Sequence, residues 1–100
     1  MGMGRLVFAW DDRKARSNER KHGVSFDEAM SVFTDDFALF DDDPESSDTE
    51  ERFVLLGLSS RLRLLVVCHA YRRSDSVIRI ISARKATALE RTSYTERRSS

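Results

Sequence analysis

The chain has 100 residues, 40% of them hydrophobic, which is enough for one domain with a single core and too few for two domains. Its 17 basic and 17 acidic residues cancel, and no apolar run approaches the ~20 residues that span a bilayer. The opening residues lack the apolar run of a secretory signal, and a single cysteine, Cys68, excludes an internal disulfide. We therefore expect one cytoplasmic domain with a reduced, buried thiol and no membrane contact.

The charges are unevenly distributed along the chain. Residues 27–51 hold eleven acidic residues and no Lys or Arg, which leaves six acidic residues against all seventeen basic ones elsewhere. This asymmetry predicts a basic surface and a separate acidic surface. The alternative is that both are ordinary solvated faces.

The first predicted elements are a strand and a helix. Residues 6–10 form a short β-type run that stops at Asp11, a residue suited to cap the helix that follows. The strongly polar residues 13–22 form that helix, and Gly23 comes next, where helices often end in a left-handed conformation. The sequence therefore predicts a helix closed at both ends by local signals.

A second helix and a second strand follow. Ser25 and Glu28 have the spacing of a capping box, and apolar residues at helical spacing continue as far as Phe33. Residues 37–40 predict a strand, and the acidic, Ser-rich residues 41–49 with the only proline predict a loop.

The second half of the chain predicts closely spaced strands and a last helix. The expected strands are 53–58, 62–71 and 77–81, and Ser82 is placed to cap a helix over 83–96. Short intervening turns predict an antiparallel meander. Helices segregated from an antiparallel sheet define the α+β class.

The two faces of the 62–71 strand differ in polarity. By strict alternation one face is wholly apolar and should lie against helices. The opposite face mixes polar and aliphatic side chains: Arg63, Leu65, Val67, His69 and Tyr71. We expect this mixed face to be partly accessible and to be the surface on which function is found.

Several blocks of residues, taken in their order and spacing, resemble the BrnT family of toxins. The blocks are Trp10-Asp11 with Lys14 and Asn18; Lys21-His22-Gly23-Val24-Ser25-Phe26 with Ala29 and Phe33; Glu51-Arg52-Phe53 with Gly57 and Ser59; Arg63-Leu64-Leu65-Val66-Val67; and Ile78-Arg79-Ile80-Ile81-Ser82-Ala83-Arg84 with Ala86, Glu90, Arg91 and Tyr94. The resemblance covers roughly residues 6–95. It implies a RelE-like fold, with two N-terminal helices, a small antiparallel sheet and a C-terminal helix.

The resemblance also implies a function and a partner. It implies a ribonuclease that cleaves RNA, halts translation and belongs to a bacterial type II toxin–antitoxin system. The implied partner is a BrnA-like antitoxin with a ribbon-helix-helix DNA-binding region, bound in a hetero-oligomer. DNA would then be met only indirectly, through the antitoxin.

Arginines are the first candidates for chemistry on RNA. RNA carries its own nucleophile, the 2′-hydroxyl, so a ribonuclease must position the backbone, move protons and stabilise charge on the phosphate oxygens. The guanidinium fork suits the last task. We predict phosphate contacts by Arg84, at the expected start of the last helix, and by Arg79, which interrupts an aliphatic strand. The alternative is that each pairs with a carboxylate such as Glu51 or Glu90 and braces the fold.

Three further residues complete the predicted catalytic set. Glu51 and Arg52 enter a strand together, either as general base and phosphate clamp or as a charge pair that protects a sheet edge. Histidine is the residue type that titrates nearest neutrality, so His22 is a candidate acid or base, although a histidine at a helix C-terminus also complements the helix dipole. His22 and His69 are isolated, with no cysteine at ligand spacing, so we expect no metal or other cofactor.

The predicted RNA-binding set lies on the first helix, the mixed strand face and the last helix. Lys14 and Lys21 are seven residues apart and so share one side of their helix, where they guide RNA or meet an acidic antitoxin. Arg63 and His69 come from the mixed face. Tyr94 either stacks on a base or packs on the sheet.

Three hypotheses follow from the sequence. The leading one is a metal-independent endoribonuclease toxin, inhibited by a partner protein. The second is a catalytically weak module on the same scaffold that pairs with an antitoxin and assists repression, because no residue is an unmistakable base. The third is a helix-turn-helix DNA-binding protein, which Asp27 and Glu28 disfavour because they would repel phosphates at the start of the second helix.

Overall fold

The computed structural model describes residues 6–45, 50–72 and 76–99 and confirms the α+β class. Its elements are β1 (Val7–Ala9), α1 (Asp12–His22), α2 (Phe26–Ser31), the short 3-10 helix η1 (Val32–Thr34), β2 (Leu39–Asp42), β3 (Phe53–Leu58), β4 (Leu64–Arg72), β5 (Val77–Lys85) and α3 (Ala88–Ser99). A strand therefore precedes the two helices. No helix within these residues is long and apolar enough to cross a membrane.

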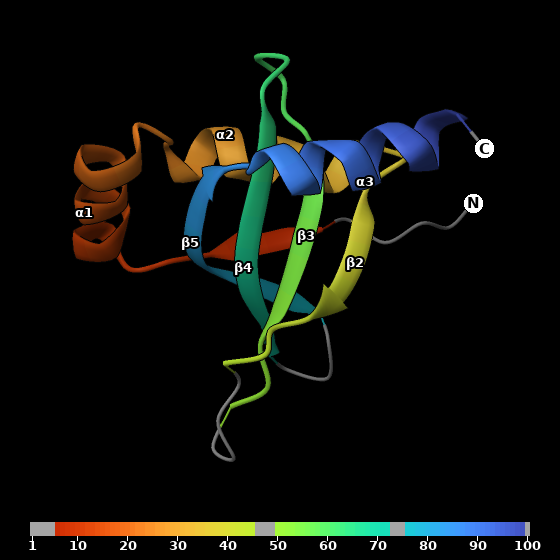
Figure 1. Ribbon diagram of the computed structural model, residues 1–100. Helices are drawn as coiled ribbons and strands as arrows, with labels where there is room; N and C mark the ends of the chain where they lie inside the picture. The colour runs from red at the N-terminus through yellow and green to blue at the C-terminus, as the bar shows by residue number, and fades with distance from the viewer. Residues whose placement is uncertain (1–5, 46–49, 73–75, 100) are drawn as a thin grey trace.

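The predicted antiparallel meander is confirmed for β2 to β5, but the sheet as a whole is mixed because β1 is added in parallel. The strand order is β1-β5-β4-β3-β2, and β2 to β5 are antiparallel neighbours (Figure 1). β1 joins the outer edge of β5 in parallel, with Val7 opposite Val77 and Ala9 opposite Arg79. Because β1 has only three residues, the second half of that edge has no strand partner within the described part of the chain.

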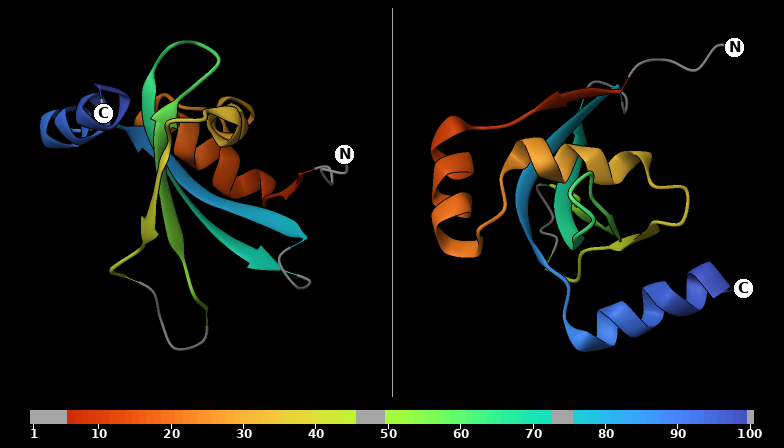
Figure 2. Two further views of the ribbon diagram at one scale, coloured as in Figure 1. Left: turned by 90° about the vertical axis from the view of Figure 1, so that its right-hand side faces the viewer. Right: turned by 90° about the horizontal axis from the view of Figure 1, so that it is seen from above.

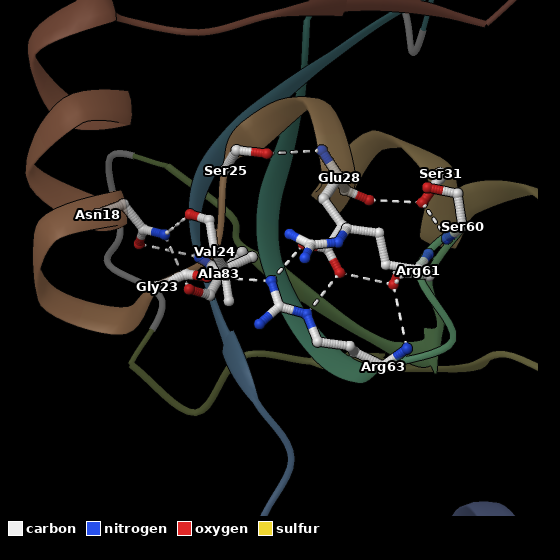
Figure 3. A network of polar contacts seen from close by, with 11 residues as sticks. Asn18, Gly23, Val24, Ser25, Glu28, Ser31, Ser60, Arg61, Arg63 and Ala83 are labelled. Atoms are coloured by element: carbon white, nitrogen blue, oxygen red, sulfur yellow. Dashed lines mark hydrogen bonds and ion pairs between the residues drawn. The ribbon is translucent and has the colours of Figure 1, made fainter.

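Helix α1 covers the rest of the β5 edge, and its one buried residue makes the connection. Asp11 accepts hydrogen bonds from two backbone N–H groups of the first turn, and Gly23, at φ 70°, ends the helix, as the sequence predicts. The amide of Asn18 donates to the carbonyls of Val24 and Ala83, each at 2.9 Å, and accepts from the Ala83 N–H at 3.1 Å (Figure 3). Asn18 thus provides hydrogen-bond partners for the backbone N–H and C=O of Ala83, on the β5 edge beyond the end of β1.

The sheet lies between α2 on one face and α3 on the other (Figures 1 and 2). The main core lies on the α2 side and comprises Val24, Phe26, Ala29, Val32, Leu55, Leu65, Val67, Ile80 and Ala83. A smaller cluster of Leu56, Leu64, Val66 and Tyr94 lies under α3.

The prediction that the mixed face of the central strand is accessible is therefore wrong, whereas Leu64 and Val66 of the apolar face do pack under α3, as expected. Leu65, Val67 and His69 lie in the interior with exposed fractions of 0%. A helix covers each face of the sheet, and the apolar side chains of α2 pack on the mixed face. The face that α3 covers only in part includes Cys68, and this face is the accessible one.

A bulge in β5 changes which side chains share a face. Cys68 pairs with Ser82 but His69 pairs with Ile80, so Ile81 is the additional residue. Arg79, on one side of the bulge, and Arg84, on the other, can therefore both lie on the α3 side of the sheet although they are five residues apart.

The last helix begins later than predicted. β5 continues to Lys85, and Thr87 caps α3 in place of Ser82. The Thr87 hydroxyl accepts from the Glu90 N–H at 3.2 Å and the Glu90 carboxylate accepts from the Thr87 N–H at 2.8 Å, which is a capping box. Arg84 therefore lies in a strand, and the expectation that it begins a helix is wrong.

The acidic loop is also shorter than predicted. Asp41 and Asp42 belong to β2 and pair with Val54 and Phe53. Of the predicted loop 41–49, the last four residues lie outside the described part of the chain.

Candidate active site

The accessible sheet face holds a cleft of about 430 Å³ beside α3. Its lining residues are Asp43, Pro44, Glu45, Arg52, Val54, Val66, Cys68, Ile81, Ser82, Arg84 and Glu90. Strands β3, β4 and β5 supply the floor, α3 contributes Glu90, and the segment after β2 contributes the acidic residues. The cleft is therefore built from segments far apart in the sequence.

Three of the predicted phosphate-binding arginines gather on this face. Arg52 and Arg84 line the cleft. Arg79 forms an ion pair with Glu50, and the same carboxylate lies 3.5 Å from Nε of Arg52. The Arg84 side chain is 43% exposed and Arg79 only 17%, so Arg84 is the more accessible of the two.

A bidentate ion pair with Glu90 orients the Arg84 side chain. Its Nη1 donates to Oε1 of Glu90 at 2.9 Å and its Nη2 donates to Oε2 at 3.0 Å. The hydrogen bond from Arg84 lowers the pKa of Glu90 to about 2, and the same bond raises the pKa of Arg84. The ion pair between Arg84 and Glu90 that the sequence suggested as an alternative is thus present. A phosphate group offers the same pair of acceptor oxygens, so it can take the place of the carboxylate.

The carboxylate between the other two arginines is Glu50, which the sequence analysis missed. Glu51, the predicted base, is exposed, and the carboxylate that meets Arg52 belongs to its neighbour. The hydrogen bond from Arg79 is the main reason that the pKa of Glu50 is lowered. Adjacent residues in an extended chain point to opposite sides, so a pair of glutamates gives no signal of which one faces the site.

Cys68 lies in the floor of the cleft as a protonated thiol. Its Sγ donates to Asp43 at 3.2 Å. Burial, reinforced by that carboxylate, raises the pKa of Cys68 to about 12. The thiol is therefore not a nucleophile at neutral pH.

Helix α1 extends the site with basic groups. A shallow depression of about 200 Å³ is lined by Lys14, Ser17, Asn18, Lys21, His22, Ile81 and Ser82. The prediction that the two lysines share one side of the helix is confirmed. Because Ile81 and Ser82 also line the cleft, the depression and the cleft adjoin across β5.

The remaining predicted RNA-binding residues have structural partners. Arg63 donates from Nε to Glu28 at 2.8 Å and from Nη2 to the Gly23 carbonyl at 3.0 Å (Figure 3). The Tyr94 hydroxyl donates to Asp35 at 2.6 Å, and the side chain is buried. These residues join α2 to the β3–β4 turn and α3 to the segment before β2, away from the cleft.

His69 lies within a group of aromatic rings rather than on an accessible face. Its ring centre is 4.9 Å from that of Phe33 and 5.3 Å from that of Tyr71. Its Nδ1 lies 3.1 Å from the Val67 carbonyl, and among the described residues Nε2 has no hydrogen-bond partner. Burial lowers the pKa of His69, so the ring is held neutral.

Lowering the pH from 7 to 5 should destabilise the fold through His69. An unfolded histidine titrates near 6.5, whereas the buried ring resists protonation, so the unfolded chain binds more protons below this pH. The contribution of His69 is present above pH 6.5 and is lost as the pH falls below it. Thermal unfolding from pH 5 to 7 should show a steeper pH dependence for the wild type than for His69→Phe, which still contains His22. Equal slopes would show that His69 does not resist protonation.

Comparison with known proteins supplies a family for this architecture. The family model described as "Ribonuclease toxin, BrnT, of type II toxin-antitoxin system" matches residues 10–90. A search of curated protein sequences gave no match. The 1.1 Å crystal structure of the Brucella abortus ribonuclease toxin BrnT is similar with a TM-score of 0.60 and 21% identity, over 83% of this chain and 99% of that chain. The structural similarity supports the fold.

Proposed function

This chain belongs to the BrnT family of ribonuclease toxins of type II toxin–antitoxin systems, and from that premise we propose that it is a metal-independent endoribonuclease acting at the arginine-lined cleft. The observation that supports this site is the gathering of Arg52, Arg79 and Arg84 on one accessible sheet face. Cleavage of RNA would halt translation. A BrnA-like antitoxin would silence the toxin in a hetero-oligomer, and contact with DNA would then pass through the antitoxin.

In the proposed reaction the RNA supplies the nucleophile. The 2′-oxygen attacks the adjacent phosphorus, the bond to the 5′-oxygen breaks, and the products are a 2′,3′-cyclic phosphate and a 5′-hydroxyl. Arg84 and Arg52 stabilise the extra negative charge on the non-bridging oxygens. These side chains provide the positive charge that a metal ion would otherwise supply, which is the reason for proposing a metal-independent reaction.

Two groups would move the protons of this reaction. Glu50 is a weak base while Arg79 is bonded to it, but a phosphate that draws Arg79 away would raise the pKa of the carboxylate. His22 lines the adjoining depression with Lys14 and Lys21, where it can protonate the leaving oxygen. The lysines attract the RNA backbone along α1. Glu51 keeps a role only if binding turns it toward the site.

One observation favours the alternative of a catalytically weak antitoxin-binding module. Arg84 and Arg79 already have carboxylate partners, Glu90 and Glu50. If these ion pairs persist when RNA is present, the scaffold binds a partner but does not stabilise a transition state. The two functions therefore differ in whether the isolated protein cleaves RNA.

Cleavage of a long purified RNA by the purified protein in EDTA tests the proposal. We expect fragments with 2′,3′-cyclic phosphate ends, and no cleavage of the same sequence made with 2′-O-methyl nucleotides, whose nucleophile is blocked. Activity that EDTA abolishes would overturn metal independence. No cleavage of free RNA or of RNA on translating ribosomes would favour the binding module.

A further inference from the structure

A second pocket, of about 350 Å³, lies where β1 meets β5. It is lined by Ala9, Trp10, Asp11, Lys14, Arg72 and Arg79. Ala9 is the register partner of Arg79 in the parallel pair, and such partners point to the same side of a sheet. Phe8 points the other way and packs on the main core. Ala9 and Arg79 therefore place one side of the pocket on the sheet face that holds the cleft.

Trp10 lines this pocket and also packs against the main core. It is partly buried, and its ring meets Phe26 edge to face, with centres 5.9 Å apart and planes at 78°. This contact fixes the orientation of the ring against the core, at the border of the pocket that Trp10 lines. The aromatic side chain nearest this pocket is therefore held in a fixed orientation.

The other side chains of the pocket are mostly cationic. Lys14, Arg72 and Arg79 contribute three positive charges, and Asp11 one negative charge. One oxygen of Asp11 is occupied by two N–H groups of the first turn of α1, and Glu50 offsets Arg79. The three positive charges exceed the two negative charges of Asp11 and Glu50, so the pocket favours an anionic ligand.

An aromatic platform among cations is the combination that binds single-stranded nucleic acid, by stacking a base and holding its phosphate. Two residues join this pocket to the site already described. Lys14 also lines the depression on α1, and Arg79 shares Glu50 with Arg52 of the cleft. A strand with one phosphate in the cleft can therefore continue into this pocket.

We propose that this pocket is a subsite for one unstacked nucleobase of the RNA, next to the nucleotide whose phosphate is cleaved. The base stacks on Trp10, and Lys14 and Arg72 hold the flanking phosphate. The subsite rests on the proposed ribonuclease function, because it requires an RNA strand in the cleft. It adds affinity with little preference among bases, since every base has a π face.

The only tryptophan of the chain provides the measurement. Fluorescence of Trp10 is followed during titration with a short 2′-O-methyl oligonucleotide, which cannot be cleaved, and with a series of matched oligonucleotides that carry one abasic site at each position. We expect the intact strand to quench the fluorescence. At one position the abasic site should abolish the quenching and weaken binding by about 5- to 150-fold, the range of base–aromatic stacking. Equal binding and equal quenching across the series would overturn the subsite.

Variants separate stacking from simple charge attraction. Trp10→Leu keeps an apolar contact with Phe26 and should bind intact and abasic strands equally in a fluorescence-polarisation assay with a labelled strand. Arg16→Ala is the matched control, because Arg16 lies on the same helix but lines a different depression with Glu19 and Arg20. This variant should keep the full difference between the strands. If Trp10→Leu does not fold, the abasic series on the wild type still decides the question.

The outcomes for the subsite and for the proposed function are distinct. A wild type that cleaves RNA but binds intact and abasic strands equally would overturn the subsite alone. A wild type that shows the base dependence but never cleaves RNA would overturn the ribonuclease proposal and leave a nucleic-acid-binding pocket.

Discussion

Replacement of Arg84 by alanine should lower the rate of RNA cleavage by about 100-fold or more, because loss of one preorganised donor to a transition-state oxyanion costs about 10²–10³ in rate. Arg84 is the most exposed of the three arginines on the cleft face, and its guanidinium already has the orientation that two phosphate oxygens require. The fold should be retained, since partly exposed ion pairs contribute roughly 0–1 kcal/mol. Initial cleavage rates and melting temperatures of both proteins measure the two effects. Growth arrest by the toxin should be lost with the cleavage.

Two further substitutions at the same ion pair serve as controls. Arg84→Lys keeps the charge but not the fork and should recover only part of the rate. Glu90→Gln keeps an acceptor for the Thr87 capping box but releases Arg84, so the cleavage rate should be retained or increased. An Arg84→Ala protein that cleaves RNA or arrests growth like the wild type would show that Arg84 is not catalytic.

The elements that were predicted correctly have their determinants close together in the sequence. Asp11 and Gly23 begin and end α1 through contacts within a few residues, as predicted, and Ser25 caps α2 by accepting from the Glu28 N–H. The predicted capping box is only half formed, because the Glu28 carboxylate accepts from Ser59 and Arg63 instead of reaching back to Ser25. The start of α3 was misplaced because Ser82 was predicted as its cap, whereas Thr87, five residues later, caps the helix. The extension of β5 decides between them, and it depends on pairing with β4.

The errors in the site come from tertiary packing. Alternation showed that the two faces of β4 differ, but not that α2 packs on the face with His69. The three arginines were identified by chemistry alone, whereas their convergence on one face depends on the bulge at Ile81. Asn18 gave no signal as a structural residue, because a polar residue in a polar helix is ordinary until its partner strand is known.

Arg63→Ala should destabilise the fold by about 3–5 kcal/mol, because it leaves a buried carboxylate without its principal cation. The Glu28 side chain is only 3% exposed and accepts hydrogen bonds from Arg63 and from the Ser59 hydroxyl, the latter at 2.7 Å. The hydrogen bond from Arg63 is the largest cause of the lowered pKa of Glu28. Arg63 also donates to the Gly23 carbonyl, so its loss uncouples the end of α1 as well. Urea unfolding of the two proteins gives the free-energy difference directly.

Arg61 provides the matched control on the same carboxylate. Its Nη1 lies 3.9 Å from Oε1 of Glu28, but the side chain is 71% exposed (Figure 3). Arg61→Ala should therefore cost less than about 1 kcal/mol, as exposed ion pairs do. Equal costs for the two variants would show that Glu28 is solvated rather than buried with Arg63. If Arg63→Ala stays stable but loses affinity for RNA, the original prediction that Arg63 binds RNA is correct, and the Glu28 pair is not what holds α2 to the β3–β4 turn.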